Sequence, residues 1–197
     1  MAVDIISRYE MLKEQFDKNT DIIESMVEKI ETTQKCLAFL NGFVEYTRNQ
    51  IKGKIEDIVN SALKCVFVDK KLNFKIIPAI TKRGVNYELY IDTDGIVTPL
   101  TDSKGGGVLD IVTLSIRIAF VRMFSNMLRQ TIILDEPFKN LDSERINPAC
   151  EWLKVISKEF GVQFIIVSHI SELIEGSNKV FQVVNVNGTS EVKVIKQ

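Results

Sequence analysis

The stretch 131-TIILDEPFKNLD-142 decides the fold class of this 197-residue chain. It begins with a short apolar run that leads directly into the acidic pair Asp135 and Glu136. Such a run is typical of a parallel strand that is buried on both faces of its sheet. Because ligands of open α/β sheets bind beyond the carboxyl ends of the strands, the stretch predicts that the two acids emerge at a binding edge.

A second strand is predicted at 162-VQFIIVSH-169, which ends at His169, the only histidine of the chain. Between the strands, Asn147 and Pro148 have the order of an N-cap and a first helical residue, and Gly161 has the place of a helix end. The unit is therefore strand, helix, strand. Because parallel strands end at one edge, we expect His169 beside the acidic pair. A lone histidine is more often structural, but this shared edge favours a catalytic role.

The acidic pair suits the hydrolysis of a phosphoryl group. Asp135 can hold a hydrated Mg²⁺, which keeps most of its waters and needs few carboxylates. Glu136 can point at a water molecule and polarise it for attack on the phosphoryl group.

A polar, glycine-rich loop opens the segment 101-TDSKGGGVLDIVTLSIRIAFVRMFSNMLR-129 and runs into a predicted helix. Three consecutive glycines, Gly105, Gly106 and Gly107, would let the backbone approach a ligand closely, and a helix N-terminus favours phosphate. The alternative is a flexible turn before a core helix, and the loop alone does not decide between them. The acidic pair at the sheet edge favours the phosphate site.

Residues 1–63 predict a long coiled-coil arm helix. Apolar residues recur at alternating steps of four and three, with polar residues at only three of these seam positions, which is a heptad pattern. At 1.5 Å per residue the helix would reach roughly 90 Å, so we expect its apolar stripe to be buried against another helix, in a partner or a second copy. The alternative is an amphipathic helix lying on its own domain. The seam consists of Ile5, Tyr9, Leu12, Phe16, Asn19, Ile23, Met26, Ile30, Thr33, Leu37, Leu40, Val44, Thr47 and Ile51.

Residues 64–197 are predicted to form one α/β lobe. The segments LNFKIIPAI and VNYELYIDT alternate with period two and predict an antiparallel hairpin, followed by a short strand at IVTPL; a further hairpin is expected at the chain terminus. The three cysteines, Cys36, Cys65 and Cys150, are odd in number and scattered, so they predict buried, reduced thiols rather than disulfides.

Composition limits the protein classes that need considering. The net charge is −1, so any nucleic-acid contact must be a local patch, and the lysines in VDKKLNFK fit solvated faces better. The sequence contains neither a signal peptide nor an apolar run of membrane-spanning length. We therefore expect a cytoplasmic protein without a membrane partner.

These residues resemble the ABC-type ATPases, and within them the SMC-like, double-strand-break-repair branch that acts on DNA. TIILDEP resembles the Walker B strand with its catalytic glutamate, FKNLD the D-loop, SH the switch histidine, and the triple glycine the signature loop. The resemblance covers about residues 60–197, the C-terminal lobe, and the arm matches the descending arm of the coiled coil that joins the two lobes. It implies the α/β fold of an ABC-type ATPase head's C-terminal lobe with an N-terminal coiled-coil helix.

The resemblance also implies ATP and Mg²⁺ as cofactors and a role for each matching residue. In this family ATP is sandwiched between two heads, so a second ATPase head is an expected partner. The roles are catalysis for Glu136 and His169, the metal for Asp135, and nucleotide binding for Ser103, Gly105, Gly106, Gly107 and Asp142.

One departure lies in the signature loop. The family usually has a serine directly before its glycines, whereas here Lys104 separates Ser103 from Gly105. Counting back twelve residues from Arg117 places Gly105 where that serine would stand. The resemblance therefore leaves the hydroxyl contact to the phosphate in doubt, while the backbone donors remain.

A larger departure is the phosphate loop. The sequence contains no G-x-x-x-x-G-K-[ST]. In the resembled family this loop lies on the N-terminal lobe, which is joined to the C-terminal lobe by the outgoing arm of the coiled coil. The loop and the partner helix are thus missing together, and one P-loop-bearing chain with a complementary arm would supply both.

Three interpretations follow. The first is the C-terminal half of a split, SMC-like ATPase for DNA recombination, repair or processing, of phage or mobile-element type, which hydrolyses ATP only after assembly. The second is a non-enzymatic protein that binds or inhibits such an ATPase through its arm and lobe. The third is a fragment of a longer polypeptide, and the residues alone do not separate it from the first.

Overall fold

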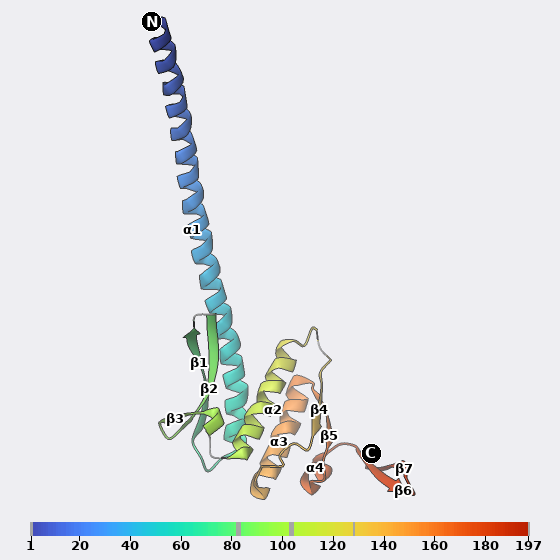
Figure 1. Cartoon of the computed structure of the whole chain (residues 1–197). Helices are drawn as coiled ribbons and strands as arrows, with labels where there is room; N and C mark the ends of the chain where they lie inside the picture. Colours follow the sequence, from blue (N-terminus) through green and yellow to red (C-terminus); the bar gives the residue numbers. More distant parts are fainter. Residues whose placement is uncertain (1, 82–83, 103–104, 128, 197) are drawn as a thin grey trace. The chain divides into compact units, whose positions relative to one another are not determined.

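A computed structural model of the chain describes residues 2–81, 84–102, 105–127 and 129–196 (Figure 1). Ser103, one of the predicted nucleotide-binding residues, lies outside these described ranges. Contacts divide the chain into two compact units, Met1–Ile51 and Lys52–Gln197. The predicted domain boundary after residue 63 stays a prediction.

Helix α1 spans Ala2–Val66 without interruption (Figure 1). All side chains from Asp4 to Gln50 are exposed, including the apolar residues of the heptad seam. The polar seam residues Thr33 and Thr47 fit the helix because their hydroxyls donate to backbone carbonyls one turn earlier, at 2.7 and 2.9 Å. The helix is as predicted, and its pairing with another helix stays a prediction.

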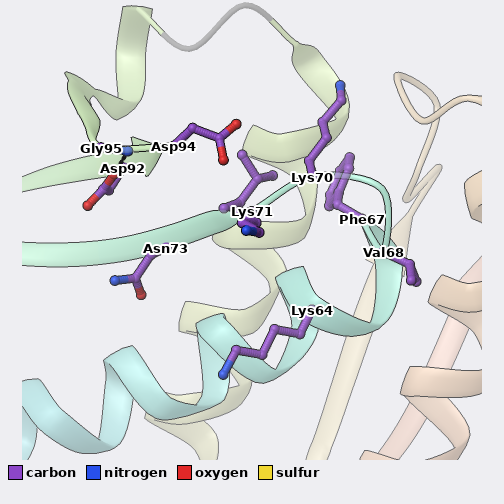
Figure 2. A pocket seen from close by; sticks show the side chains of 10 residues that line it. Lys64, Phe67, Val68, Lys70, Lys71, Asn73, Asp92, Asp94 and Gly95 are labelled. Carbon is purple, nitrogen blue, oxygen red and sulfur yellow. Dashed lines mark hydrogen bonds between the residues drawn. The ribbon is translucent and has the colours of Figure 1, made fainter.

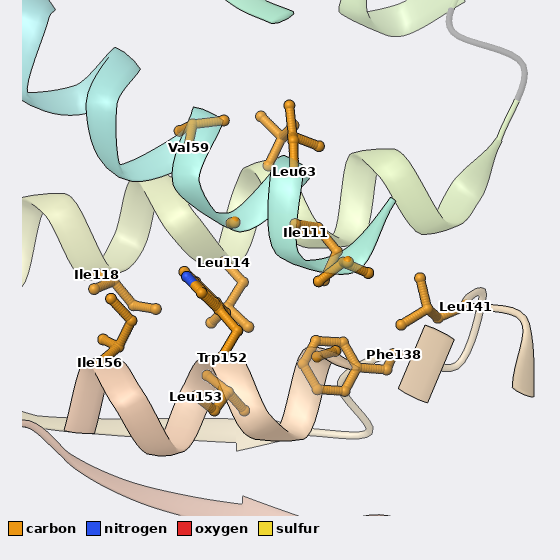
Figure 3. Close-up of a cluster of buried hydrophobic side chains, with 14 of the residues drawn as sticks. Val59, Leu63, Ile111, Leu114, Ile118, Phe138, Leu141, Trp152, Leu153 and Ile156 are labelled. Carbon is orange, nitrogen blue, oxygen red and sulfur yellow. The ribbon is translucent and has the colours of Figure 1, made fainter. Parts of the chain in front are cut away.

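Three helices supply much of the core of the second unit, and strands and loops add further large apolar side chains. Val59 and Leu63 of α1 meet Ile111, Leu114 and Ile118 of α2 (Gly106–Met123), and α3 (Ser143–Phe160) adds its own apolar side (Figure 3). The last turns of α1 therefore belong to the folded lobe. Burial of this apolar surface stabilises the lobe. The core residues that α3 contributes are Ile146, Ala149, Cys150, Trp152, Leu153 and Ile156.

The predicted hairpin and short strand form one antiparallel sheet. Strand β1 (Leu72–Thr81) pairs with β2 (Gly84–Thr93), and β2 pairs with β3 (Ile96–Pro99). The short helix η1 (Leu100–Asp102) follows. Asn60 of α1 ties the sheet to the helix, because its amide donates to the carbonyl of Phe74 at 3.1 Å and accepts from the amide of Phe74 at 2.7 Å.

Strands β4 (Thr131–Asp135) and β5 (Gln163–Val167) form the predicted parallel pair, with α3 between them in sequence. Gly161 ends α3 in the left-handed conformation, at φ 67°, as predicted. The predicted helix start at Asn147 is wrong. Helix α3 begins at Ser143 because Asp142, also a favoured N-cap residue, stands before it with an extended backbone, and Pro148 lies inside the helix.

The prediction that TIILD is buried on both faces is also wrong for this chain. Ile132 and Leu134 are buried, but Ile133 faces the other way and is 70% exposed. Ile133 pairs with Ile165 and Asp135 pairs with Val167, and all four side chains are exposed. Parallel sheets are normally covered on both faces. The β4–β5 pair has one covered face and one bare face, which carries Ile133, Ile165 and Val167 together with Asp135.

Two strands complete the described chain. After α4 (Ser171–Gly176), β6 (Val180–Val186) and β7 (Thr189–Lys196) form the expected terminal hairpin. Phe181, Val183 and Val192 are all exposed on it. In the part of the chain that the structure describes, no helix is both long and apolar enough to cross a membrane.

The prediction of three buried thiols is wrong for two of them. Cys36 and Cys65 are exposed, whereas Cys150 is buried in α3. Both exposed cysteines lie on α1: every side chain around Cys36 is exposed, and Cys65 occupies an exposed position in the last turns of the helix. Burial raises the pKa of the Cys150 thiol. Only Cys150 behaves as a small core residue.

Candidate functional site

The candidate catalytic residues Glu136 and His169 meet at the carboxyl edge of the β4–β5 sheet. Nδ1 of His169 lies 3.0 Å from Oε2 of Glu136. The two residues follow β4 and β5 by one and two positions, and the amide of Glu136 continues the ladder by donating to the carbonyl of Val167 at 2.8 Å. The shared edge expected from the sequence is therefore the place where the two side chains approach.

The two side chains differ in exposure. The His169 side chain is 84% exposed and that of Glu136 is 37% exposed. Oε2 of Glu136 is itself buried, and no hydrogen bond of standard geometry reaches it from the described residues. The 3.0 Å approach is thus a close polar contact rather than a well-aligned hydrogen bond. Such a carboxylate can accept a proton from water, and the imidazole can orient it.

The turn after β4 holds Glu136 in an unusual backbone conformation. Glu136 has a φ of 47° and Phe138 a φ of 69°. Residues other than glycine rarely adopt such positive φ angles. The turn is fixed by the buried Phe138 ring and by the amide of Leu141, which donates to the carbonyl of Phe138 at 2.9 Å. Strained backbone of this kind persists only where the surroundings over-determine it.

Asp135 ends β4 on the bare face of the sheet, next to Val167 of β5. Within the described ranges, no group of three or more His, Cys, Asp or Glu side chains is placed to hold a metal ion. A single exposed carboxylate does not make a cage for a dehydrated cation. It does fit Mg²⁺, which keeps several waters and takes one or two carboxylates together with substrate phosphates.

The three candidate glycines have different surroundings. Gly105 is the N-cap of α2, and a Cβ added there would meet only a Val108 methyl group at 3.9 Å. A Cβ on Gly106 would lie 2.8 Å from Cβ of Asn140, and one on Gly107 would lie 2.9 Å from Cδ1 of Leu141. Gly105 is therefore open to a ligand, while the other two let α2 pack closely on the loop after β4.

Asp110 adds a second link between α2 and this loop. Its carboxylate accepts from the backbone amide of Asn140 at 3.3 Å and from the Asn140 side-chain amide at 3.2 Å. Sequence reasoning missed Asp110 and Asn140, since 30 residues separate them and only the packed helix reveals their proximity. The predicted nucleotide-binding residue Asp142 lies at the end of the same loop, exposed, as the N-cap of α3.

Within the described part of the lobe, one cavity contains candidate residues and another, larger one does not. A cavity of about 200 Å³ is lined by α2 residues, including Asp110 and Arg117, and by Leu134 to Lys139. A larger one, of about 430 Å³, is lined by Lys64 and Phe67 and by the β2–β3 turn at Asp94 (Figure 2). The smaller cavity is the one that contains candidate residues, because Asp135 and Glu136 line it.

The sequence is similar to proteins described as DNA double-strand break repair Rad50 ATPases. It is 38% identical to the protein of Thermoplasma acidophilum over 93 residues, 46% of this chain and 10% of that relative. It is 28% identical to the protein of Sulfolobus acidocaldarius over 155 residues, 75% of this chain and 15% of that relative. The chain thus spans 10% to 15% of the length of these relatives. No model of a known protein family matches the sequence.

The fold is similar to that of solved SMC head domains. The Smc head domain with a coiled coil and joint from Pyrococcus yayanosii matches with a TM-score of 0.63 at 16% identity, over 88% of this chain and 33% of that one. The SMC head domain from Thermotoga maritima matches with a TM-score of 0.52 at 20% identity, over 73% and 48%. At these identities the likeness concerns the fold, and it confirms the predicted α/β class with a long N-terminal helix.

A third structure, from work on ATP-driven dimerization and DNA-stimulated activation of SMC ATPases, has a TM-score of 0.60 at 18% identity and matches 79% of this chain and 89% of that one. Because the match covers most of both chains, the two chains are of similar length. The sequence similarity to the Rad50 ATPases and the similarity to the SMC head fold together support the resemblance of this chain to an SMC-like, Rad50-related ABC-type ATPase lobe.

Proposed function

We propose that the chain is the C-terminal lobe of an SMC-like ATPase and takes part in ATP hydrolysis only after joining a P-loop-bearing lobe. That lobe is carried either by a separate chain or by another segment of a longer polypeptide. The observation that carries the proposal is the 3.0 Å approach of His169 to Glu136 at the carboxyl edge of β4 and β5. The edge holds the groups that act on water, while the sequence lacks the loop that would hold the phosphates.

Each residue at this edge has a proposed role. ATP supplies the bond that is broken, and Mg²⁺ supplies neutralising charge at its phosphates. Asp135 would hold the hydrated ion. Glu136 accepts a proton from the attacking water, and His169 orients the Glu136 carboxylate.

The glycine loop and Asp142 serve the nucleotide of a second head. Gly105 leaves the N-terminus of α2 open, where backbone amides and the helix dipole favour phosphate. The assignment of Ser103 stays a prediction. Gly106 and Gly107 serve the same end indirectly, because their close packing fixes the start of α2 against the loop that ends at Asp142.

The bare surfaces of the chain support a missing lobe as the partner. The exposed face of β4 and β5 carries Ile133, Ile165 and Val167, and the seam of α1 is apolar over most of its length. A sheet face and a helix stripe of this kind are normally buried. A P-loop lobe with its own arm would cover both, which is why we prefer it to a partner that binds the arm alone.

The biological role of the assembled protein is also a proposal. The relatives' names point to DNA double-strand break repair, and solved Smc heads include one bound to the C-terminal domain of ScpA. We therefore propose that the assembled protein acts on DNA, with a second ATPase head. A cytoplasmic location and a phage or mobile-element origin remain predictions.

Assembly can be tested without measuring catalysis. The P-loop lobe and arm encoded next to this chain, or in the same polypeptide, would be purified and mixed with it, and hydrogen exchange would be measured on β4 and β5. We expect a stable one-to-one complex in which both strands become more protected. Protection confined to α1 would contradict lobe completion, and it would favour the alternative of a protein that only binds an ATPase of this family through its arm.

A further inference from the structure

Arg145, in the first turn of α3, contacts a segment of the chain that lies far away in sequence. Its two terminal nitrogens donate to both carboxylate oxygens of Asp69, at 2.7 and 2.9 Å. One of them also donates to the carbonyl of Val66, the last residue of α1, at 3.4 Å. The guanidinium lies 4.7 Å from the centre of the Phe67 ring. Arg145 thus binds the segment of residues 66–69, which we call the arm base.

The same side chain contacts the loop that follows Glu136. Nε of Arg145 lies 3.4 Å from Oδ2 of Asp142, and the backbone amide of Arg145 donates to the carbonyl of Asp142 at 2.9 Å. The Arg145 side chain is 16% exposed. A planar guanidinium can bind a carboxylate with two parallel hydrogen bonds and still direct its third nitrogen elsewhere. Arg145 therefore bridges the arm base and the loop.

Both charges of the bridge persist over the ordinary pH range. The hydrogen bond from Arg145 lowers the pKa of Asp69 from 3.8 to about 2. The hydrogen bond to Asp69 raises the pKa of Arg145, and burial opposes this rise. Both groups of the bridge are therefore charged near neutral pH.

The loop between Glu136 and Asp142 needs such support. Glu136 and Phe138 both have positive φ angles, so contacts on either side support the loop in addition to the buried Phe138 ring and the Leu141 amide. On one side Asp110 of α2 binds Asn140. On the other side the contact is Arg145 with the arm base.

We propose that Arg145 is a positioning residue, through which the arm base sets the geometry of the loop and hence of Glu136. The proposal deepens the proposed function and rests on it for the role of Glu136. A displacement of residues 66–69 would pull on Arg145 and change the start of α3 and the loop before it. The link between the arm base and the loop is specific, because Arg145 donates two hydrogen bonds to the single carboxylate of Asp69.

Hydrogen exchange of the chain by itself tests the link. In Asp69→Asn we expect the amide of Leu141, which donates within the loop, to exchange about tenfold faster, while amides of β5 keep their rates. Asp69→Glu keeps the charge and should restore the slow exchange. The matched control is Asp92→Asn, which removes another 2.7 Å ion pair, that with Lys75, and should leave Leu141 unchanged.

Two outcomes would overturn the positioning role. One is equal exchange at Leu141 in Asp69→Asn and Asp92→Asn. The other is faster exchange throughout the lobe, which would mean that the ion pair only stabilises the fold.

The ATPase activity of the assembled protein gives a second, independent test of the positioning role of Arg145. With the P-loop lobe present, Asp69→Asn should lower kcat for ATP and leave KM unchanged, because the loop positions the base rather than the nucleotide. A raised KM with an unchanged kcat would contradict the proposal. If the pair never hydrolyses ATP, the proposed function fails, while the exchange experiment still decides whether Arg145 holds the loop.

Discussion

Ile133 and Leu134 are neighbours on β4, yet Ile133 is 70% exposed and Leu134 is 4% exposed. Successive side chains of a strand point to opposite faces, so this contrast separates the covered face of the sheet from its bare face. The covered face meets the core. The bare face carries Ile133 beside Ile165 and Val167, all of them exposed.

Alanine substitutions on the two faces should therefore differ strongly in the chain by itself. We expect Leu134→Ala to lower the free energy of unfolding by about 2–5 kcal/mol, since it truncates a buried side chain. Ile133→Ala should change it by less than about 0.5 kcal/mol. Urea unfolding of both variants checks this, and an equal loss in the two would mean that the bare face is covered within the chain.

Two of the candidate glycines should affect folding differently. Gly107→Ala places a Cβ 2.9 Å from Cδ1 of Leu141 and 3.1 Å from the carbonyl oxygen of Asn140, so we expect a loss of about 1–3 kcal/mol from overpacking. Gly105→Ala meets open space and should cost less than about 1 kcal/mol as an N-cap change. Thermal unfolding of the two variants measures these losses of stability. Equal costs would remove the distinction between a packing glycine and an open one.

The arm should associate with a second copy when no other partner is present. The seam of α1 is exposed from Ile5 to Ile51, and a heptad stripe of this length is stable only when paired. Leu37→Asp puts a charge into the seam and should give monomers in sedimentation equilibrium. Asn49→Asp adds the same charge on the opposite side of the helix and should leave the association intact. A monomeric wild-type chain at high concentration would refute self-association.

Acid should weaken the bridge between Asp69 and Arg145. The pKa of Asp69 is lowered from 3.8 to about 2 in the folded chain, so its contribution to stability is present above pH 3.8 and is lost as the pH falls toward 2. We expect Asp69→Asn to lower the melting temperature relative to wild type near neutral pH, and the gap to close toward pH 2. A gap that stays constant over this range would mean that the carboxylate charge plays no part.

Much of the fold follows from local patterns. Period-two alternation predicted the β1–β2 hairpin, the heptad steps predicted α1, and Gly161 predicted the end of α3. The helix start was missed because Asp142 and Asn147 are both good N-cap residues, and the sequence alone does not show that Ile146 packs into the core. The bare face of β4 was missed because an apolar run does not reveal what covers it.

The candidate site could be predicted in part. The sequence motifs predicted that Glu136 and His169 share one edge of the sheet, and the two side chains lie in contact there. The contacts of Asp110 with Asn140 and of Arg145 with Asp69 span 30 and 76 residues, so no short pattern in the sequence marks them. The roles of the site residues remain predictions until activity is measured.

The central claim is that this chain supplies the water-activating half of an ATPase site and depends on a partner for the phosphate-binding half. The most direct measurement is ATP turnover by the purified chain, by the P-loop lobe, and by the two together, with Glu136→Gln as the matched variant. We predict no turnover by either piece, turnover by the pair, and loss of that turnover but not of ATP binding in Glu136→Gln, since the base acts on water. Robust turnover by this chain alone that depends on Glu136, or a tight pair that never turns over, would contradict it.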